Sequence, residues 1–276
     1  MSWEDAVRWY RAQPGTVVAV LHNYFDLPVA VAAERYRASE EFGKVIEHLG
    51  LGAGRKALDV GSGNGIASYA LARSGWRVVS LEPDPSDEVG AGAIRRLAAV
   101  GLPIEVLTAW GERIPLEDKS VSAVFARQVL HHARDLDQMV SELARVLTPG
   151  GRMLTVRDHV AESDAELAEF LNSHPLHRHY GGENAFPLGR YHTAFRAAGL
   201  RLIDSWGPYS SILNYYPGTE AERQQKLVDV SRVRFKGAGR WLAWSRGFRE
   251  LTARKLDRLC DAPGRLYSFL LEKPVS

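Results

Sequence analysis

The chain contains a single cysteine, Cys260, among its 276 residues. One cysteine excludes an intramolecular disulfide, a zinc site made of several thiolates and an iron–sulfur cluster. We expect Cys260 to be a small buried hydrophobic residue of a helix rather than a nucleophile.

Long apolar runs are also missing, and none approaches the length of a membrane span. The first residues lack the basic and apolar regions of a signal peptide. The formal net charge is only +2, which implies no strong overall attraction to nucleic acid. With 45% hydrophobic and 25% charged residues, the composition is that of a globular protein, which we expect to be cytoplasmic and to fold as one domain over 1–276.

What the chain does have is a glycine-rich segment between two acidic strand ends. Ala57–Gly65 places Asp59 near the end of an apolar run and glycines at 61, 63 and 65, and Glu82 ends the next apolar run. Such glycines let a ligand approach bare backbone, and a carboxylate at the second strand end accepts both hydroxyls of a ribose. Asp59 makes the turn poor for a pyrophosphate and better for a cationic ligand, so S-adenosylmethionine suits it better than NAD.

Apolar runs and helical patterns alternate from 56 to 158, which predicts an α/β fold with a doubly wound, Rossmann-like sheet. The pattern of residues 1–50 predicts helices, and the second of these helices spans 28–49. Ligands bind where parallel strands end, so the loops after the strands should converge. The ranges predicted as strands are 56–60, 77–82, 104–108, 121–126 and 152–158, with a turn at 149–151 before the last.

These segments resemble the class I S-adenosylmethionine-dependent methyltransferases, closest to the small-molecule subgroup that includes the ubiquinone-biosynthesis enzymes (methyltransferase type 11). The resemblance covers about residues 50–158. It rests on the segments 57–65, 78–83, 110–115, 128–135 and 142–151, and the last of these, ending in Arg145–Gly151, is specific for the group.

The resemblance implies a seven-stranded sheet whose last strand is antiparallel, with 200–206 and 265–272 as the sixth and seventh strands. It also implies S-adenosylmethionine as cofactor and S-adenosylhomocysteine as product. Glu82 would bind the ribose, the glycine turn the methionine part, and the segment at 110–112 the adenine. The implied cofactor residues are Asp59, Gly61, Ser62, Gly63, Gly65, Glu82, Pro83, Trp110, Gly111, Glu112, Arg127 and Gln128.

Two departures from the family pattern concern Trp110 and Ser122, where relatives often carry acidic residues. Trp110 accepts no hydrogen bond from the adenine, so it either stacks on the ring or packs as a half-buried tryptophan. The change at Ser122 should affect packing alone.

Three further parts of the chain lie outside the predicted cofactor-binding core, which spans 51–158. We predict an N-terminal helical lid over 1–50, with Tyr24, Arg35 and Tyr36 near the cofactor. Insertions at 159–188 and 207–264 should form the substrate cap. The second has 58 residues, far too many for a hairpin loop between the sixth and seventh strands.

The later insertion has eleven Lys/Arg against four Asp/Glu over 221–258, with Trp241, Trp244, Phe248 and Leu251 at helical spacing. We favour a helix whose aromatic face packs on the domain while its basic residues face solvent. A surface for an anionic substrate or for membrane headgroups is the less favoured alternative. The chain lacks a recognisable RNA-binding module, so a small-molecule partner is expected and nucleic acid is not.

Six of the nine histidines lie between 131 and 179. His174, His177 and His179 are close enough in sequence to suggest a metal site, but we predict ordinary loop histidines and no metal. His159 and His132 are the candidate catalytic bases, since both follow predicted strands and histidine titrates near neutral pH; His132 could instead be a structural cap of its loop. The predicted substrate-binding residues are His131, His174, His177, Tyr180 and Glu183.

Taken together, the sequence predicts methyl transfer to an oxygen or nitrogen atom of a metabolite, natural product or sugar-like molecule by in-line displacement. Two alternatives stay open. One is an NAD-dependent oxidoreductase, which the glycine spacing and Arg145–Gly151 disfavour. The other is a catalytically silent protein that binds the cofactor as a scaffold. The sequence does not define the acceptor or the oligomeric state.

Overall fold

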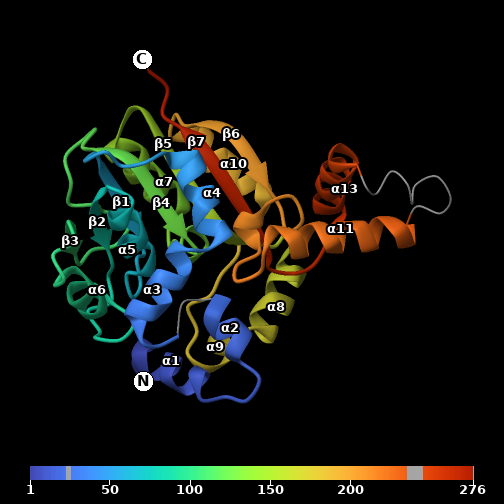
Figure 1. Cartoon of the computed structure of the whole chain (residues 1–276), viewed down its shortest axis with the longest axis horizontal. Helices are drawn as coiled ribbons and strands as arrows, with labels where there is room; N and C mark the ends of the chain where they lie inside the picture. The colour runs from blue at the N-terminus through green and yellow to red at the C-terminus, as the bar shows by residue number, and fades with distance from the viewer. Residues whose placement is uncertain (23–25, 235–244, 276) are drawn as a thin grey trace.

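A seven-stranded sheet lies at the centre of the molecule (Figure 1). The structure is a computed structural model that describes residues 1–22, 26–234 and 245–275. The strand order is β3-β2-β1-β4-β5-β7-β6, and β7 runs antiparallel to both of its neighbours while the other pairs are parallel. This confirms the predicted Rossmann-like sheet. The strands are β1 (Lys56–Val60), β2 (Arg77–Leu81), β3 (Ile104–Leu107), β4 (Val121–Arg127), β5 (Leu147–Val160), β6 (Arg201–Trp206) and β7 (Arg265–Glu272).

Both faces of the sheet are buried, which explains why the central strands read as nearly continuous apolar runs. On β4, Val124 belongs to one hydrophobic core, while Ala123 and Phe125 belong to the core on the opposite face. One face is covered by α3 (Val29–Arg37), α4 (Glu40–Leu49), α5 (Ile66–Arg73) and α6 (Ala91–Ala98). The other is covered by α7 (Leu136–Val146) and α10 (Leu188–Ala197).

Two predicted elements differ from the structure. The helix predicted over 28–49 is interrupted between α3 and α4, where the Ser39 hydroxyl caps α4 by accepting from the amide of Phe42. The turn predicted at 149–151 is part of β5, which begins at Leu147. Gly150 has a φ of 73°, and the register with β4 shifts there, so the turn signal marks an irregularity inside a strand.

Helices fill both insertions and the N-terminal segment, as predicted. The first insertion has α8 (Asp164–Ser173) and α9 (Pro175–His179), and the second has α11 (Glu220–Arg234) and α13 (Arg246–Leu259), which extend from the body in Figure 1. Short 3-10 helices cover Leu130–His132 and Ile212–Asn214. Cys260 follows α13 and is half-buried, so the expectation of a buried helical cysteine was wrong.

The N-terminal helices α1 (Trp3–Arg11) and α2 (Val17–His22) pack on the first insertion. Ala6, Tyr10 and Val20 form a small core with Leu176 of α9, and the Trp9 ring stacks on His179 with centroids 3.8 Å apart. Within the described part of the chain, no helix combines the length and apolarity that crossing a membrane requires.

Candidate active site

The glycine turn between β1 and α5 depends on backbone that other residues adopt poorly. Gly61, Gly63 and Gly65 have φ values of 58°, 55° and 85°. A Cβ on Gly61 would also lie 2.7 Å from a methyl carbon of Val129, so glycine is required there for space as well. Gly65 begins α5 as its N-cap. The turn therefore presents bare backbone to the space above the sheet edge.

Two buried carboxylates stand beside this turn. An oxygen of Glu82 accepts from the Gly63 amide at 2.7 Å and its other oxygen accepts from the Asp84 amide at 2.9 Å. Asp59 accepts from the Ser68 hydroxyl at 2.5 Å. Burial raises the pKa of Asp59 to about 7, and burial also raises the pKa of Glu82 to about 7. Each Glu82 oxygen has lone pairs left to accept from a ribose hydroxyl.

The predicted adenine segment lies beyond β3. Trp110 is 54% exposed, and the guanidinium carbon of Arg134 lies 4.5 Å from its ring centroid. Glu112 accepts from the Arg134 amide at 2.9 Å, which ties the segment to the loop after β4. Gly111 contacts Met139, where a Cβ would lie 2.6 Å from the terminal methyl carbon. Arg134 was missed by the sequence reasoning, because a cation–π contact between two loops leaves no pattern.

Arg127 and Gln128, at the end of β4, are held by buried contacts. Arg127 donates to Glu41 at 2.8 Å, and both side chains are almost fully buried. Arg127 also donates to the Gln128 side-chain oxygen at 2.6 Å. Gln128 has a φ of 56°, an uncommon conformation for this residue type.

A cluster of imidazoles and one carboxylate forms the opposite wall. His131 and His132 follow β4, His159 lies near the end of β5, and Glu183 lies in the loop after α9. The Nε2 atoms of His131 and His132 lie 3.7 and 3.8 Å from a Glu183 oxygen, and His174 lies 3.9 Å from the other oxygen. One donor atom from each of His131, His159 and Glu183 lies within 4.8 Å of the others, a grouping that could hold a metal ion.

Asp158 orients His131 from beneath. Its Oδ1 accepts from the backbone amides of Val129 and His131 at 3.2 and 3.3 Å, and from His131 Nδ1 at 3.0 Å. Burial lowers the pKa of His131, but the hydrogen bonds with Asp158 and Glu183 outweigh this effect and raise that pKa to about 9. Asp158 was not among the predicted site residues, although an acidic residue near the end of a predicted strand was a usable signal.

The other ionisable groups of the cluster respond to burial and to His131. Burial and then the charge of His131 lower the pKa of His159 to about 3, and the same two causes lower the pKa of His132. Burial would raise the pKa of Glu183, but the interactions with His131, His132 and His174 hold that pKa well below its usual range. His132 keeps 41% of its side chain exposed.

One cavity of about 590 Å³ brings most of these residues together. Of the predicted site residues, Gly65 and His177 do not line it, so His177 is not placed for substrate binding. Trp3 of α1 and Leu176 of α9 line it and were not predicted. The predicted residues that do line it are Asp59, Gly61, Ser62, Gly63, Glu82, Pro83, Trp110, Gly111, Glu112, Arg127, Gln128, His131, His132, His159, His174, Tyr180 and Glu183.

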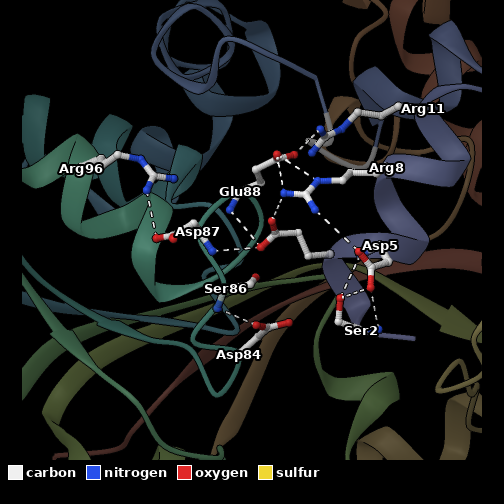
Figure 2. Close-up of polar contacts among 10 residues, drawn as sticks. Ser2, Asp5, Arg8, Arg11, Asp84, Ser86, Asp87, Glu88 and Arg96 are labelled. Atoms are coloured by element: carbon white, nitrogen blue, oxygen red, sulfur yellow. Dashed lines mark hydrogen bonds and ion pairs between the residues drawn. The ribbon is translucent and has the colours of Figure 1, made fainter.

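The described residues named for the predicted N-terminal lid do not reach the cavity, and the lid itself stays a prediction. Arg35 is bonded to Asp26 and to the hydroxyl of Tyr216, and Tyr36 is fully buried, so neither lines the cavity. Tyr24 lies outside the described residues. α1 is instead tied to the loop that follows Glu82, where Glu88 accepts from Arg8 and Arg11 (Figure 2).

The second insertion contributes no described residue to the cavity wall, so its part in the substrate cap stays a prediction. Two residues of its predicted aromatic face, Trp241 and Trp244, lie outside the described residues. A third, Leu251, is 71% exposed and so does not pack on the domain as predicted. Arg223 is not solvated as expected, because it is buried in ion pairs with Glu220 and Glu250 at 2.6 and 2.9 Å.

Comparison with known proteins finds methyltransferases among those that this chain is similar to. A family model described as a methyltransferase domain matches residues 58–155. The uncharacterized methyltransferase YcgJ of Bacillus subtilis is 27% identical over 74% of this chain and 83% of its own length. The crystal structure of YcgJ superposes with a TM-score of 0.55 at 21% identity, covering 86% of this chain and 99% of YcgJ.

Other relatives match over less of their length. A ubiquinone biosynthesis O-methyltransferase from Rhizobium rhizogenes is 29% identical over 62% of this chain and 66% of its own length. A tRNA U34 carboxymethyltransferase from Cellvibrio japonicus is 31% identical over 43% of this chain and 37% of its own length. The residues that match the family model, 58–155, run from β1 into β5.

Proposed function

We propose that this protein transfers the methyl group of S-adenosylmethionine to an oxygen or nitrogen atom of a small molecule, since residues 58–155 match the model of a methyltransferase domain. One observation carries the proposal: a single cavity is lined by the glycine turn, by Glu82 and by the histidine cluster. Its volume lies in the range of small-molecule sites.

The cofactor residues suit a nucleoside with a cationic sulfur. The carboxylate of Glu82 accepts the two ribose hydroxyls, and the backbone at Gly61 and Gly63, which lines the same cavity, contacts the methionine part. Asp59 adds a second acidic group near the turn, which favours the sulfonium and ammonium charges over the pyrophosphate of NAD.

Methyl transfer requires alignment of the acceptor atom, the methyl carbon and the sulfur, together with exclusion of water. The acceptor–carbon bond forms as the carbon–sulfur bond breaks, and the sulfur keeps the electron pair and loses its positive charge. An acceptor hydroxyl must also lose a proton. Nδ1 of His132 donates to the Gly182 carbonyl at 2.9 Å and Nδ1 of His159 donates to the Gly264 carbonyl at 2.6 Å. Their Nε2 atoms therefore carry no proton, and His132 is the better base of the two, because burial and the charge of His131 lower the pKa of His159 to about 3.

Calorimetry with purified protein tests cofactor binding. S-adenosylmethionine and S-adenosylhomocysteine should bind in the micromolar range. Glu82→Ala should abolish most of this affinity, whereas Glu105→Ala, at an exposed position of β3, should not change it. Unchanged binding by Glu82→Ala would contradict the ribose assignment, and NADH binding more tightly than S-adenosylmethionine would contradict the proposed function.

Transfer of an isotope-labelled methyl group to a panel of hydroxyl and amine acceptors tests the chemistry. His132→Asn or His159→Asn should lower turnover while cofactor affinity changes little, because neither histidine is among the hydrogen-bond partners of Glu82. A protein that binds the cofactor and methylates none of these acceptors would support the scaffold alternative.

A further inference from the structure

Three side chains with atoms that can bind a metal ion face one another in the cavity wall. Glu183 contributes a carboxylate, and His131 and His159 each contribute a ring nitrogen, all within 4.8 Å of one another. His131 and Glu183 are 1% and 9% exposed at their side chains. A carboxylate and two imidazoles buried this close together need a shared positive species, which a proton on His131 supplies in the metal-free chain and a bound metal ion would supply in its place.

The hydrogen bonds of the two histidines fix which nitrogens face this point. Nδ1 of His159 donates to the carbonyl of Gly264 at 2.6 Å, since a carbonyl only accepts. Nδ1 of His131 lies 3.0 Å from Asp158 Oδ1, which already accepts from two backbone amides. Both Nε2 atoms are thereby left to bind elsewhere. A carboxylate or carbonyl behind each histidine is the arrangement that orients histidine ligands of metals.

We propose that His131, His159 and Glu183 bind a divalent transition-metal ion, with Zn²⁺ as the best-fitting example. Two imidazoles and one carboxylate suit zinc or its first-row neighbours, whereas Mg²⁺ and Ca²⁺ prefer oxygen ligands. Ligand atoms about 2.1 Å from one tetrahedral ion lie about 3.4 Å apart, so the widest pair, within 4.8 Å here, must approach by up to about 1.4 Å. Glu183 follows Gly181 and Gly182 in a loop, so it can make this adjustment.

This site replaces two sequence-based interpretations. The cluster that suggested a metal by its spacing, His174, His177 and His179, is not the one that the structure assembles. His159, a candidate base, becomes a ligand, and His132 remains beside the site, with its Nε2 3.8 Å from a Glu183 oxygen.

The site suggests an acceptor class and therefore rests on the proposed function. Three protein ligands leave positions open on the ion, and an oxygen bound there has a lowered pKa. A hydroxyl acceptor would pass its proton to Nε2 of His132, its oxygen would bond to the methyl carbon, and the sulfur would leave as the neutral thioether. The site thus favours hydroxyl over amine acceptors, and best those with a neighbouring oxygen that binds the same ion.

Metal binding is tested on the metal-stripped full chain by titration with Zn²⁺, and with Co²⁺ followed by its visible absorption. The wild type should bind one ion in the micromolar range or tighter. Glu183→Gln, which keeps the shape of the side chain, should weaken Zn²⁺ binding about 100-fold or more. Even the loss of a hydrogen-bond partner behind a ligand lowers metal affinity about 10–100-fold. Asp158→Asn, which changes the partner of His131 rather than a ligand, should weaken Zn²⁺ binding by about 10–100-fold. His192→Asn, on α10 outside the cavity, should bind like the wild type.

Two results would overturn the metal site: no saturable Zn²⁺ binding by the wild type, or equal affinity for Zn²⁺ in the wild type and Glu183→Gln. A proton held between His131 and Glu183 would then be the shared positive species. Calorimetry on the same proteins separates this from the proposed function. Glu183→Gln should still bind S-adenosylmethionine, and Glu82→Ala should still bind Zn²⁺. A chain that binds Zn²⁺ but no S-adenosylmethionine would contradict the proposed function and leave the metal site standing.

Discussion

Glu82 is a buried carboxylate that must be ionised to serve a ribose well. It is 7% exposed, and burial raises its pKa to about 7, with the nearby charges of Asp84 and Asp59 adding to the rise. The amides of Gly63 and Asp84 oppose the rise by donating to its oxygens. The side chain therefore changes its charge near neutral pH. The affinity of a ligand that needs two acceptor oxygens should change with it.

We predict that adenosine, used as a probe without groups that titrate near neutral pH, binds more weakly as the pH falls through 7. Protonation of Glu82 replaces an acceptor by a donor. If only the carboxylate binds, a pKa of about 7 gives about tenfold weaker binding at pH 6 than at pH 8. Calorimetry from pH 6 to 8 measures this. Glu82→Gln should bind weakly with a flat profile, and a profile that persists in this variant would assign the titration to Asp59.

For single residues, the sequence predicted which side chains line the cavity better around the glycine turn than around the histidines. Asp59, the glycines and Glu82 lie in one short segment whose spacing is set by local strand and turn geometry, so a pattern can detect them. Asp158 and Arg134 act through contacts between separate loops, and His177 falls outside the cavity because α9 turns its side chain elsewhere. Such placements depend on tertiary packing.

Among the elements, α1 is the one whose attachment is most exposed. It adds Trp3 to the cavity wall and is held to residues 84–88 by polar contacts (Figure 2). Glu88 accepts from Arg8 and from Arg11 at 2.8 Å in each case, and Glu4 accepts from the amide of Asp87 at 3.0 Å. Because this loop follows Glu82 directly, α1 covers the predicted cofactor site through charged surface contacts rather than through the main core.

Removing Glu88 should therefore release α1 without unfolding the domain. In Glu88→Ala, hydrogen exchange of the amides in residues 5–11 should become several-fold faster, while exchange in β1 and β4 stays slow. Surface ion pairs contribute little to global stability, so the melting temperature should hardly change. Glu47→Ala, which removes the exposed ion pair with Lys44, serves as the control. Unchanged exchange in residues 5–11 would mean that the apolar contacts with α9 suffice to hold α1.

The strands were predicted well because both faces of the sheet are buried, and the glycines and prolines between them mark the turns. β5 shows the limit of this reasoning. Gly150 and Gly151 predict a turn, yet backbone hydrogen bonds to Lys273, just after β7, continue β5 through them. Pairing with a neighbouring strand outweighs a local turn preference, and the sequence does not reveal which neighbours are present.

Across the whole molecule, one buried ionic cluster joins segments that are distant in sequence. Glu41 of α4 accepts from Arg127 of β4 at 2.8 Å and lies 3.7 Å from Arg157 of β5. Arg157 donates to the carbonyl of Tyr216, in the second insertion, at 3.0 Å. The cluster thus links the N-terminal helices, two central strands and the second insertion, and through Arg127 it reaches the cavity. The sequence predicted each segment but not this connection, since acidic and basic residues 86 and 116 positions apart have no recognisable spacing.

Loss of Glu41 should destabilise the whole domain rather than one element. Glu41→Gln keeps the size of the side chain but leaves two buried arginines without their carboxylate, and breaking a buried pair in this way costs about 3–5 kcal/mol. Chemical denaturation should show one cooperative transition at a lower denaturant concentration, followed alike by tryptophan fluorescence and circular dichroism. Glu47→Ala, on the exposed face of the same helix, should unfold like the wild type. Because Arg127 lines the cavity, Glu41→Gln should also weaken S-adenosylmethionine binding under conditions where the protein is still folded. A midpoint equal to that of the wild type would mean that solvent or nearby hydrogen bonds compensate the arginines, and the cluster would then not be what joins these segments.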